Sequence, residues 1–141
     1  MDHTSIFENI NWLATFVATL GAFMLGALWH SKLLFSNSWV KEHSLTPDHA
    51  TGANMGLIFG LTFLQFFVGA LIFEILIQNH FPEIGIFHGI LLGLFIGLGW
   101  IGTAFGVSYL YLRKSLKIWM IDAGYYIVGY MIMGLVLAAW K

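Results

Sequence analysis

The stretch IGIFHGILLGLFIGLGWIGTAFGVSYL, residues 84–110, decides the fold. It contains no Asp, Glu, Lys or Arg, and it exceeds the roughly 20 residues that a helix needs to cross the hydrocarbon core of a bilayer. Residues 10–31, 54–79 and 116–140 form three more apolar stretches, and each of them also exceeds the length needed to cross the bilayer. The sequence therefore predicts an all-α, polytopic membrane protein whose four transmembrane helices form a single domain over 1–141.

Composition supports a membrane location and excludes several classes of function. Of the 141 residues, 59% are hydrophobic and 9% are charged, so the lipid bilayer is the expected surrounding. The formal net charge of −1 argues against a nucleic-acid partner, which would require a concentrated basic patch. The chain has no cysteine, which rules out disulfides, thiolate metal sites and cysteine nucleophiles. We expect neither a metal nor a cofactor.

The connections between the four stretches predict an orientation. Five basic residues lie in the first and third connections, namely Lys32, Lys41, Arg113, Lys114 and Lys117, whereas the second has none and the termini have only Lys141. Basic loops remain on the cytoplasmic side, so both termini are predicted to lie outside the cytoplasm. The first connection is the longest, and we expect a short surface helix in it from about Phe35 to His43.

Small residues at four-residue spacing predict tight, glycine-mediated helix packing, because transmembrane helices associate by close backbone approach. The residues expected at these contacts are Ala18, Ala22, Gly26, Gly56, Gly60, Gly89, Gly93 and Gly97. The third stretch is the richest in glycine, which predicts that it is the central helix. The alternative interpretation is that these glycines form a hinge or line a ligand site. The bundle either closes alone or pairs with a second copy, and a homodimer is favoured.

Ionisable and polar groups at membrane depth are the candidate site residues, because burying them there is costly. Asp122 lies inside the fourth stretch, and we expect it to pair with His30 in a layer that includes Thr62 and Thr103. The alternative is a structural carboxylate bonded to a Tyr, Trp or Arg side chain. Nearer the midplane, a small polar cavity is expected from Gln65, Trp100, Tyr126 and Tyr130, or else hydrogen bonds that join the helices.

Two further acidic or basic side chains, Glu74 and His88, are expected near the outer surface, where water reaches them. They are either interfacial residues or an entry point for a cation or proton. The loop cluster Glu42, His43, Asp48 and His49 lacks recognisable metal-ligand spacing, so a solvated polar loop is expected there.

Several motifs in the chain resemble a known family. They are Asn11-Trp12-Leu13-Ala14, Gly21-Ala22-Phe23, Gly26-Ala27-Leu28-Trp29-His30-Ser31 with Leu34-Phe35 and Trp39, and Ile121-Asp122-Ala123-Gly124-Tyr125-Tyr126. They resemble domain of unknown function 1761, a family of small bacterial four-helix membrane proteins, which implies a bacterial inner (cytoplasmic) membrane. The family more usually has Tyr at position 30, Asn at 122 and His at 126. The resemblance supports the fold and implies no activity.

Three functional hypotheses follow. The first is a small homo-oligomeric bundle that translocates or binds a proton, ion or small solute near Asp122. The second is a membrane-embedded enzyme or lipid-binding protein with a pocket near His30 and Asp122, although the sequence has no motif that indicates an enzyme. The third is an accessory subunit that binds another membrane protein, which predicts that a ridge of glycines remains exposed on the bundle.

Overall fold

The computed structural model describes residues 6–140, and every regular element among them is helical. Four helices are long and apolar enough to cross a membrane. They are α1 (Trp12–Trp29), α3 (Met55–His80), a composite helix over Ile86–Tyr111, and α6 (Leu116–Ala139). The composite helix consists of α4 (Ile86–Ile96), the π-helical segment η2 (Gly97–Gly102) and α5 (Thr103–Tyr111). The all-α fold and the four long apolar helices are as predicted.

Side-chain caps fix where three of the helices begin. Asn11 caps α1, Asn54 caps α3 and Ser115 caps α6, each accepting a hydrogen bond from the backbone N–H three residues on. Such a cap satisfies one of the first N–H groups of a helix, which have no partner within the helix itself. A short helix, α2 (Ser36–Glu42), lies between α1 and α3, so the predicted surface helix is confirmed.

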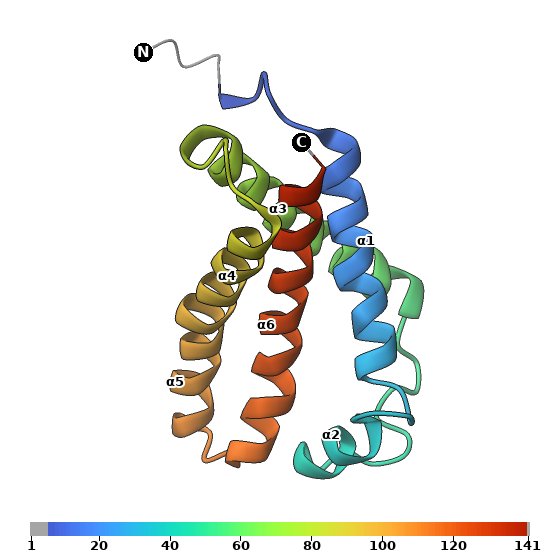
Figure 1. Cartoon of the computed structure of the whole chain (residues 1–141). Coiled ribbons are helices and arrows are strands. Elements are labelled where there is room, and N and C mark those ends of the chain that lie inside the picture. Colours follow the sequence, from blue (N-terminus) through green and yellow to red (C-terminus); the bar gives the residue numbers. More distant parts are fainter. Residues whose placement is uncertain (1–5, 141) are drawn as a thin grey trace.

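The two ends of the bundle differ in what they carry (Figure 1). One end, here called the terminal end, carries the start of α1, the end of α6 and the turn between α3 and α4. There the side-chain amide of Asn11 donates a hydrogen bond to the backbone oxygen of Trp140 over 2.9 Å. The opposite end, here called the loop end, carries α2 and the turn from α5 to α6. The basic residues of the first and third connections belong to the elements of the loop end.

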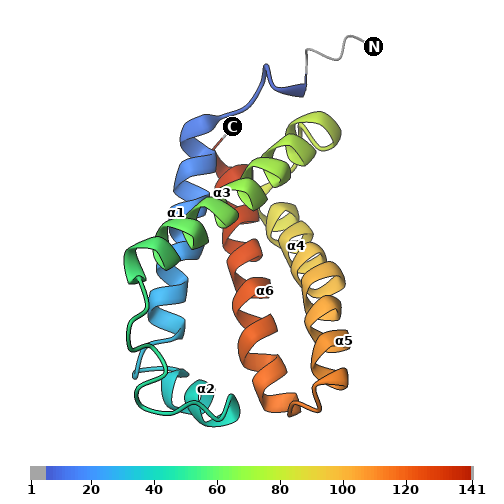
Figure 2. The same ribbon diagram turned by 180° about the vertical axis from the view of Figure 1, so that it is seen from behind.

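Helix α6 is the centre of the structure. It contacts α1, α2, α3, α4, η2 and α5, and Figures 1 and 2 show it between α1 and the α4–α5 helix, with α3 crossing obliquely. The prediction that the third stretch is central is therefore wrong. Three of its glycines, Gly89, Gly93 and Gly97, pack against the backbone of a single neighbour, α6. A side chain at Gly93 would collide with the carbonyl of Tyr130.

The small residues of α1 and α3 have different surroundings. On α1, Ala18 and Ala22 are wholly buried, and a Cβ atom at Gly26 would lie 2.5 Å from the hydroxyl of Tyr125. On α3, Gly56 and Gly60 are exposed and no other helix lies against them. The predicted packing at those two glycines is therefore not present within this chain. Residues 51–61 are exposed throughout, because the first turns of α3 diverge from the bundle (Figure 2).

Candidate functional site

Asp122 on α6 is surrounded by three donors at the loop end. Its Oδ1 accepts a hydrogen bond from Trp39 Nε1 at 2.9 Å, and its Oδ2 lies 2.9 Å from His43 Nε2 and accepts a hydrogen bond from the Tyr109 hydroxyl. The residue is only 8% exposed. We call these four residues the Asp122 cage. Both carboxylate oxygens have partners within the chain, so the cage joins three elements of the fold.

The cage holds α2 across the loop end. Trp39 lies on α2 and His43 caps its C-terminus one turn later, so both side chains face α6. The Ser115 hydroxyl adds a further bond to the carboxylate of Glu42. The prediction of a solvated loop is thus wrong for His43, which lies against Asp122. The bonds from Trp39 and Tyr109 agree with the alternative expected for Asp122, a structural carboxylate bonded to a Tyr, Trp or Arg side chain. The identity of the three partners was not predicted, although the four-residue spacing of Trp39 and His43 in a predicted helix is a signal for two of them.

The predicted pair of Asp122 with His30 is not formed. His30 follows the last residue of α1, and its Nδ1 lies 3.1 Å from the backbone oxygen of Gly26. Its ring packs edge-on against Trp39 and Tyr125, with ring centroids 5.7 and 5.2 Å apart. His30 therefore supports the aromatic residues behind the cage and does not contact the carboxylate.

A cleft opens on the same face of α6, further from the loop end. It has a volume of about 370 Å³ and is lined by Thr62, Gln65, Phe66, Ile101, Phe105, Tyr126 and Tyr130. These residues come from α3, η2, α5 and α6. The lining brings together three of the four residues expected at a midplane cavity, namely Gln65, Tyr126 and Tyr130. Thr62 was expected in the layer of His30 and Asp122 and not in this cavity, and Phe66 and Phe105 were not among the predicted site residues.

Aromatic rings form one wall of the cleft. The ring of Tyr126 is stacked between Phe66 and Phe105, with centroid distances of 5.8 and 5.3 Å and an interplanar angle of 29° on each side. Phe105 also packs edge-on against Tyr109 of the Asp122 cage, at 5.6 Å. One continuous aromatic row therefore connects the cleft to the cage.

The π-helical segment η2 passes beside the cleft and contributes Ile101 to its lining. A π-helical turn disturbs the regular pairing of backbone groups, and such turns are frequent at functional sites. Here side chains bind the carbonyl oxygens of the segment. The Thr103 hydroxyl donates to Gly99 at 2.6 Å, with a second contact to Trp100 at 3.1 Å, and Trp119 Nε1 donates to Gly102 at 2.9 Å.

Thr103 and Trp100 therefore do not belong to a polar cavity. Thr103 is exposed, and its hydroxyl is occupied by the backbone of η2. Trp100 is 71% exposed and is absent from the cleft lining, so its predicted place in the cavity is wrong. The π-helical turn changes the direction of the side chains along this helix, which regular helical spacing does not anticipate.

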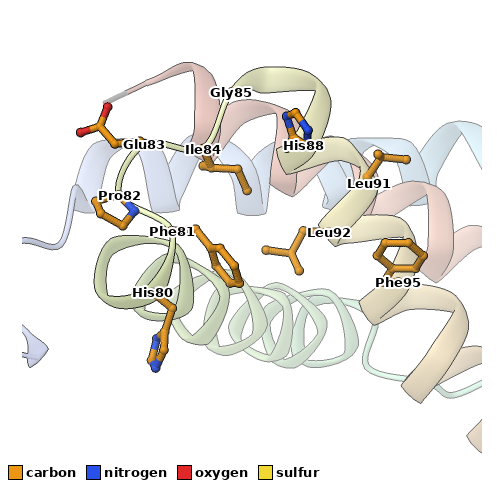
Figure 3. Close-up of a pocket in the computed structure, with 10 residues that line it drawn as sticks. All are labelled: His80, Phe81, Pro82, Glu83, Ile84, Gly85, His88, Leu91, Leu92 and Phe95. Carbon is orange, nitrogen blue, oxygen red and sulfur yellow. The ribbon is translucent and has the colours of Figure 1, made fainter.

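At the terminal end, Glu74 and His88 differ in their exposure to solvent. Glu74 is wholly buried, so the prediction that water reaches it is wrong. His88 is exposed and lines a hollow of about 500 Å³ at the α3–α4 turn. Figure 3 shows Phe81, Ile84 and Leu92 converging on this hollow, whereas His80 and Glu83 point away from it. The hollow is larger than the cleft but mostly apolar.

No cluster of three or more His, Cys, Asp or Glu side chains that could hold a metal occurs within residues 6–140. A family model described as "Protein of unknown function (DUF1761)" matches residues 13–138. Neither the curated proteins nor the solved structures contain a significant match to the chain.

Proposed function

Because the chain belongs to the DUF1761 family of proteins of unknown function, we propose its function from the cleft itself. The protein binds a small, neutral, flat, lipid-soluble molecule that carries oxygen acceptors. The observation that carries this proposal is the group of polar side chains on the cleft wall, at Gln65, Tyr126 and Tyr130. None of them makes a hydrogen bond to another residue in the described part of the chain.

The polar groups of the cleft define what the ligand must offer. In apolar surroundings a hydroxyl or amide without a partner costs about 1–3 kcal/mol. The Thr62 hydroxyl donates to the backbone oxygen of Ile58 at 2.7 Å, but the donors of Gln65, Tyr126 and Tyr130 are available. A ligand with carbonyl or hydroxyl oxygens would accept hydrogen bonds from these donors.

The rest of the lining favours a neutral, flat molecule. No Asp, Glu, His, Lys or Arg lines the cleft, so nothing there compensates a full charge, and an ion is disfavoured. The stacked rings of Phe66, Tyr126 and Phe105 offer a surface on which a planar ring can stack. The volume, about 370 Å³, lies within the usual range for small-molecule pockets.

Binding is favoured over translocation by what lies beyond the cleft. The aromatic row runs from the cleft into the Asp122 cage, where α2 is bonded across the loop end. A solute could continue in that direction only after three hydrogen bonds to Asp122 had broken. The position of the cage in that direction supports binding over translocation.

The test uses the full-length chain in lipid nanodiscs with a short-chain benzoquinone as the probe, a flat neutral ring with two carbonyl acceptors. A ligand that binds only the folded chain raises Tm in a concentration-dependent way. We expect a saturable rise for the wild type and for the exposed control Trp100→Phe. In Gln65→Leu and Tyr130→Phe the half-saturating concentration should increase at least tenfold. No saturable rise in the wild type, or equal responses in all four proteins, would refute the proposal.

A second candidate function, self-association, is favoured by the exposed start of α3. Gly56 and Gly60 form a GxxxG spacing, a motif at which transmembrane helices pair closely, and the turns that carry it diverge from the bundle. An exposed glycine ridge is what the accessory-subunit hypothesis predicts, and the partner that we propose for it is a second copy of the chain. We expect Gly60→Leu to convert dimers to monomers in single-molecule photobleaching, whereas Gly99→Leu, at another glycine with open space around it, leaves them intact. Equal populations in both variants would exclude this interface.

The orientation is also part of the proposal. The concentration of basic residues at the loop end favours a cytoplasmic loop end in a bacterial inner membrane, with the terminal end outside. The chain has no cysteine, so single cysteines at Ser44 and Glu83 can be labelled selectively. A membrane-impermeant maleimide added to intact cells should label position 83 and spare position 44. The reverse pattern would invert the orientation.

A further inference from the structure

Glu74 is a buried acid with one oxygen that the described residues leave unpartnered. It lies on α3 and is 0% exposed. Its Oε1 accepts two hydrogen bonds, from the backbone N–H of Asn11 at 3.1 Å and from Gln78 Nε2 at 2.9 Å. Its Oε2 is buried as well, and it has no hydrogen-bond partner among residues 6–140.

A carboxylate in this position requires a positive partner. Burying an unpaired charge is far more costly than burying a neutral polar group, and ionisable groups in membrane segments normally pair with another group. Within residues 6–140 the one close contact between an acidic and a basic side chain joins Asp122 to His43 at the opposite end, 2.9 Å apart. No Lys or Arg of the described chain neutralises Glu74.

A polar hollow lies next to the two residues that hold Glu74. It measures about 440 Å³ and is lined by Glu8, Asn9, Ile10, Asn11, Gln78 and Pro82. Asn11 and Gln78 belong to this lining and also bond Glu74 Oε1. Glu74 lies behind these residues and is not itself part of the lining. The lining carries the side-chain amide oxygens of Asn9 and Gln78 and the exposed carboxylate of Glu8, whereas the amide oxygen of Asn11 already accepts from the N–H of Ala14. Such oxygens are the ligands that hard cations prefer.

We propose that Glu74 binds a monovalent hard cation such as sodium, which enters through this hollow. The free Oε2 supplies the charged ligand, and oxygens of the hollow complete the coordination. Glu8 is exposed to solvent, so Glu74 supplies the one buried negative charge, and a monovalent ion matches that charge better than a divalent one. The site lies at the terminal end, apart from the cleft, and does not depend on the function proposed for it.

The experiment measures Tm of the full-length chain in nanodiscs as sodium chloride replaces choline chloride at constant ionic strength. The methyl groups of choline keep its charge too far from a carboxylate oxygen for direct coordination, so the comparison separates sodium binding from general salt effects. We expect a saturable rise in Tm with sodium for the wild type. The same Tm in both salts would overturn the proposal without any variant.

Two variants locate the effect. Glu74→Gln keeps the shape and an oxygen acceptor but removes the charge, and it should increase the half-saturating sodium concentration at least tenfold. The matched control Glu83→Gln changes an exposed acid at the same end and should keep the wild-type response. A sodium response that persists unchanged in Glu74→Gln would overturn the assignment. Failure of the benzoquinone test would leave this result unaffected, because no residue is shared by the two sites.

Discussion

Two regions on one face of α6 differ in how their polar groups are satisfied. Asp122 has donors on both oxygens, supplied by α2 and α5. Tyr126 and Tyr130 follow at four-residue intervals, so they lie on the same face, yet their hydroxyls make no hydrogen bond within the described residues. A polar group that is fully paired stabilises the structure, whereas one that is unpaired can bind something else. The comparison separates a structural carboxylate from a candidate ligand site.

Removing the carboxylate of the cage should have the largest effect. Asp122→Ala leaves the donors of Trp39, His43 and Tyr109 without their acceptor. With about 1–3 kcal/mol for each buried donor left unpaired, and some recovered by water at the loop end, we expect a loss of about 3 kcal/mol in the free energy of unfolding. Denaturant titration in detergent measures it. Asp48→Ala, at an exposed acid, is the control, and an equal effect of both changes would show that the cage contributes no stability.

Removing one donor should have a smaller effect. Trp39→Phe keeps an aromatic ring on α2 but deletes one hydrogen bond to a charged group, which contributes about 1.5–3 kcal/mol. We therefore expect a loss of about 2 kcal/mol and faster amide hydrogen exchange in α2. Trp100→Phe removes an indole from an exposed position and should change neither quantity. Unchanged exchange in Trp39→Phe would mean that this bond does not hold α2.

Neutralising the acid should cost less than deleting it. In Asp122→Asn the remaining oxygen still accepts, and the new amide can donate to His43 Nε2 when that nitrogen is unprotonated. We expect a loss of about 1 kcal/mol with the fold intact, as measured by denaturant titration and near-ultraviolet circular dichroism. A loss as large as that of Asp122→Ala would mean that the negative charge, and not the acceptor geometry, maintains the cage.

Removing a polar group of the cleft that has no hydrogen-bond partner in the described chain should have the smallest effect on stability. Tyr130→Phe removes a hydroxyl that makes no hydrogen bond in the described chain, so the free energy of unfolding should change by less than about 0.5 kcal/mol. The benzoquinone response should nevertheless weaken. A stability loss similar to that of Trp39→Phe would mean that the Tyr130 hydroxyl stabilises the fold, as the Asp122 cage does, and is not available to a ligand.

Much of the fold could be predicted because hydropathy and loop composition act locally. The four long apolar helices and α2 follow from them. The central helix could not be predicted, because glycine content indicates close approach but not which helix approaches. Gly89, Gly93 and Gly97 all face α6, whereas Gly99 has open space around it, so the composite helix is contacted mainly on one side.

The candidate site was predictable only in part. Asp122 was singled out because an acid in an apolar helix is costly, but its partners Trp39 and His43 are 83 and 79 residues distant in the sequence. Counting residues from the ends of the apolar stretches placed Gln65 and Tyr126 at a similar depth near the midplane, and both line the cleft. The same counting failed for Trp100, because η2 interrupts the regular helical spacing. Contacts between distant segments, and departures from ideal helical geometry, were beyond the reach of pattern alone.

Native mass spectrometry of the chain released from nanodiscs tests the ligand proposal most directly. Wild-type protein prepared with the short-chain benzoquinone should carry one probe molecule per chain, and Trp100→Phe should carry the same load. The double variant Gln65→Leu with Tyr130→Phe should lose the bound probe while it remains folded. A wild-type chain without the probe, or equal loading of the folded double variant, would contradict the assignment of the cleft as a binding site.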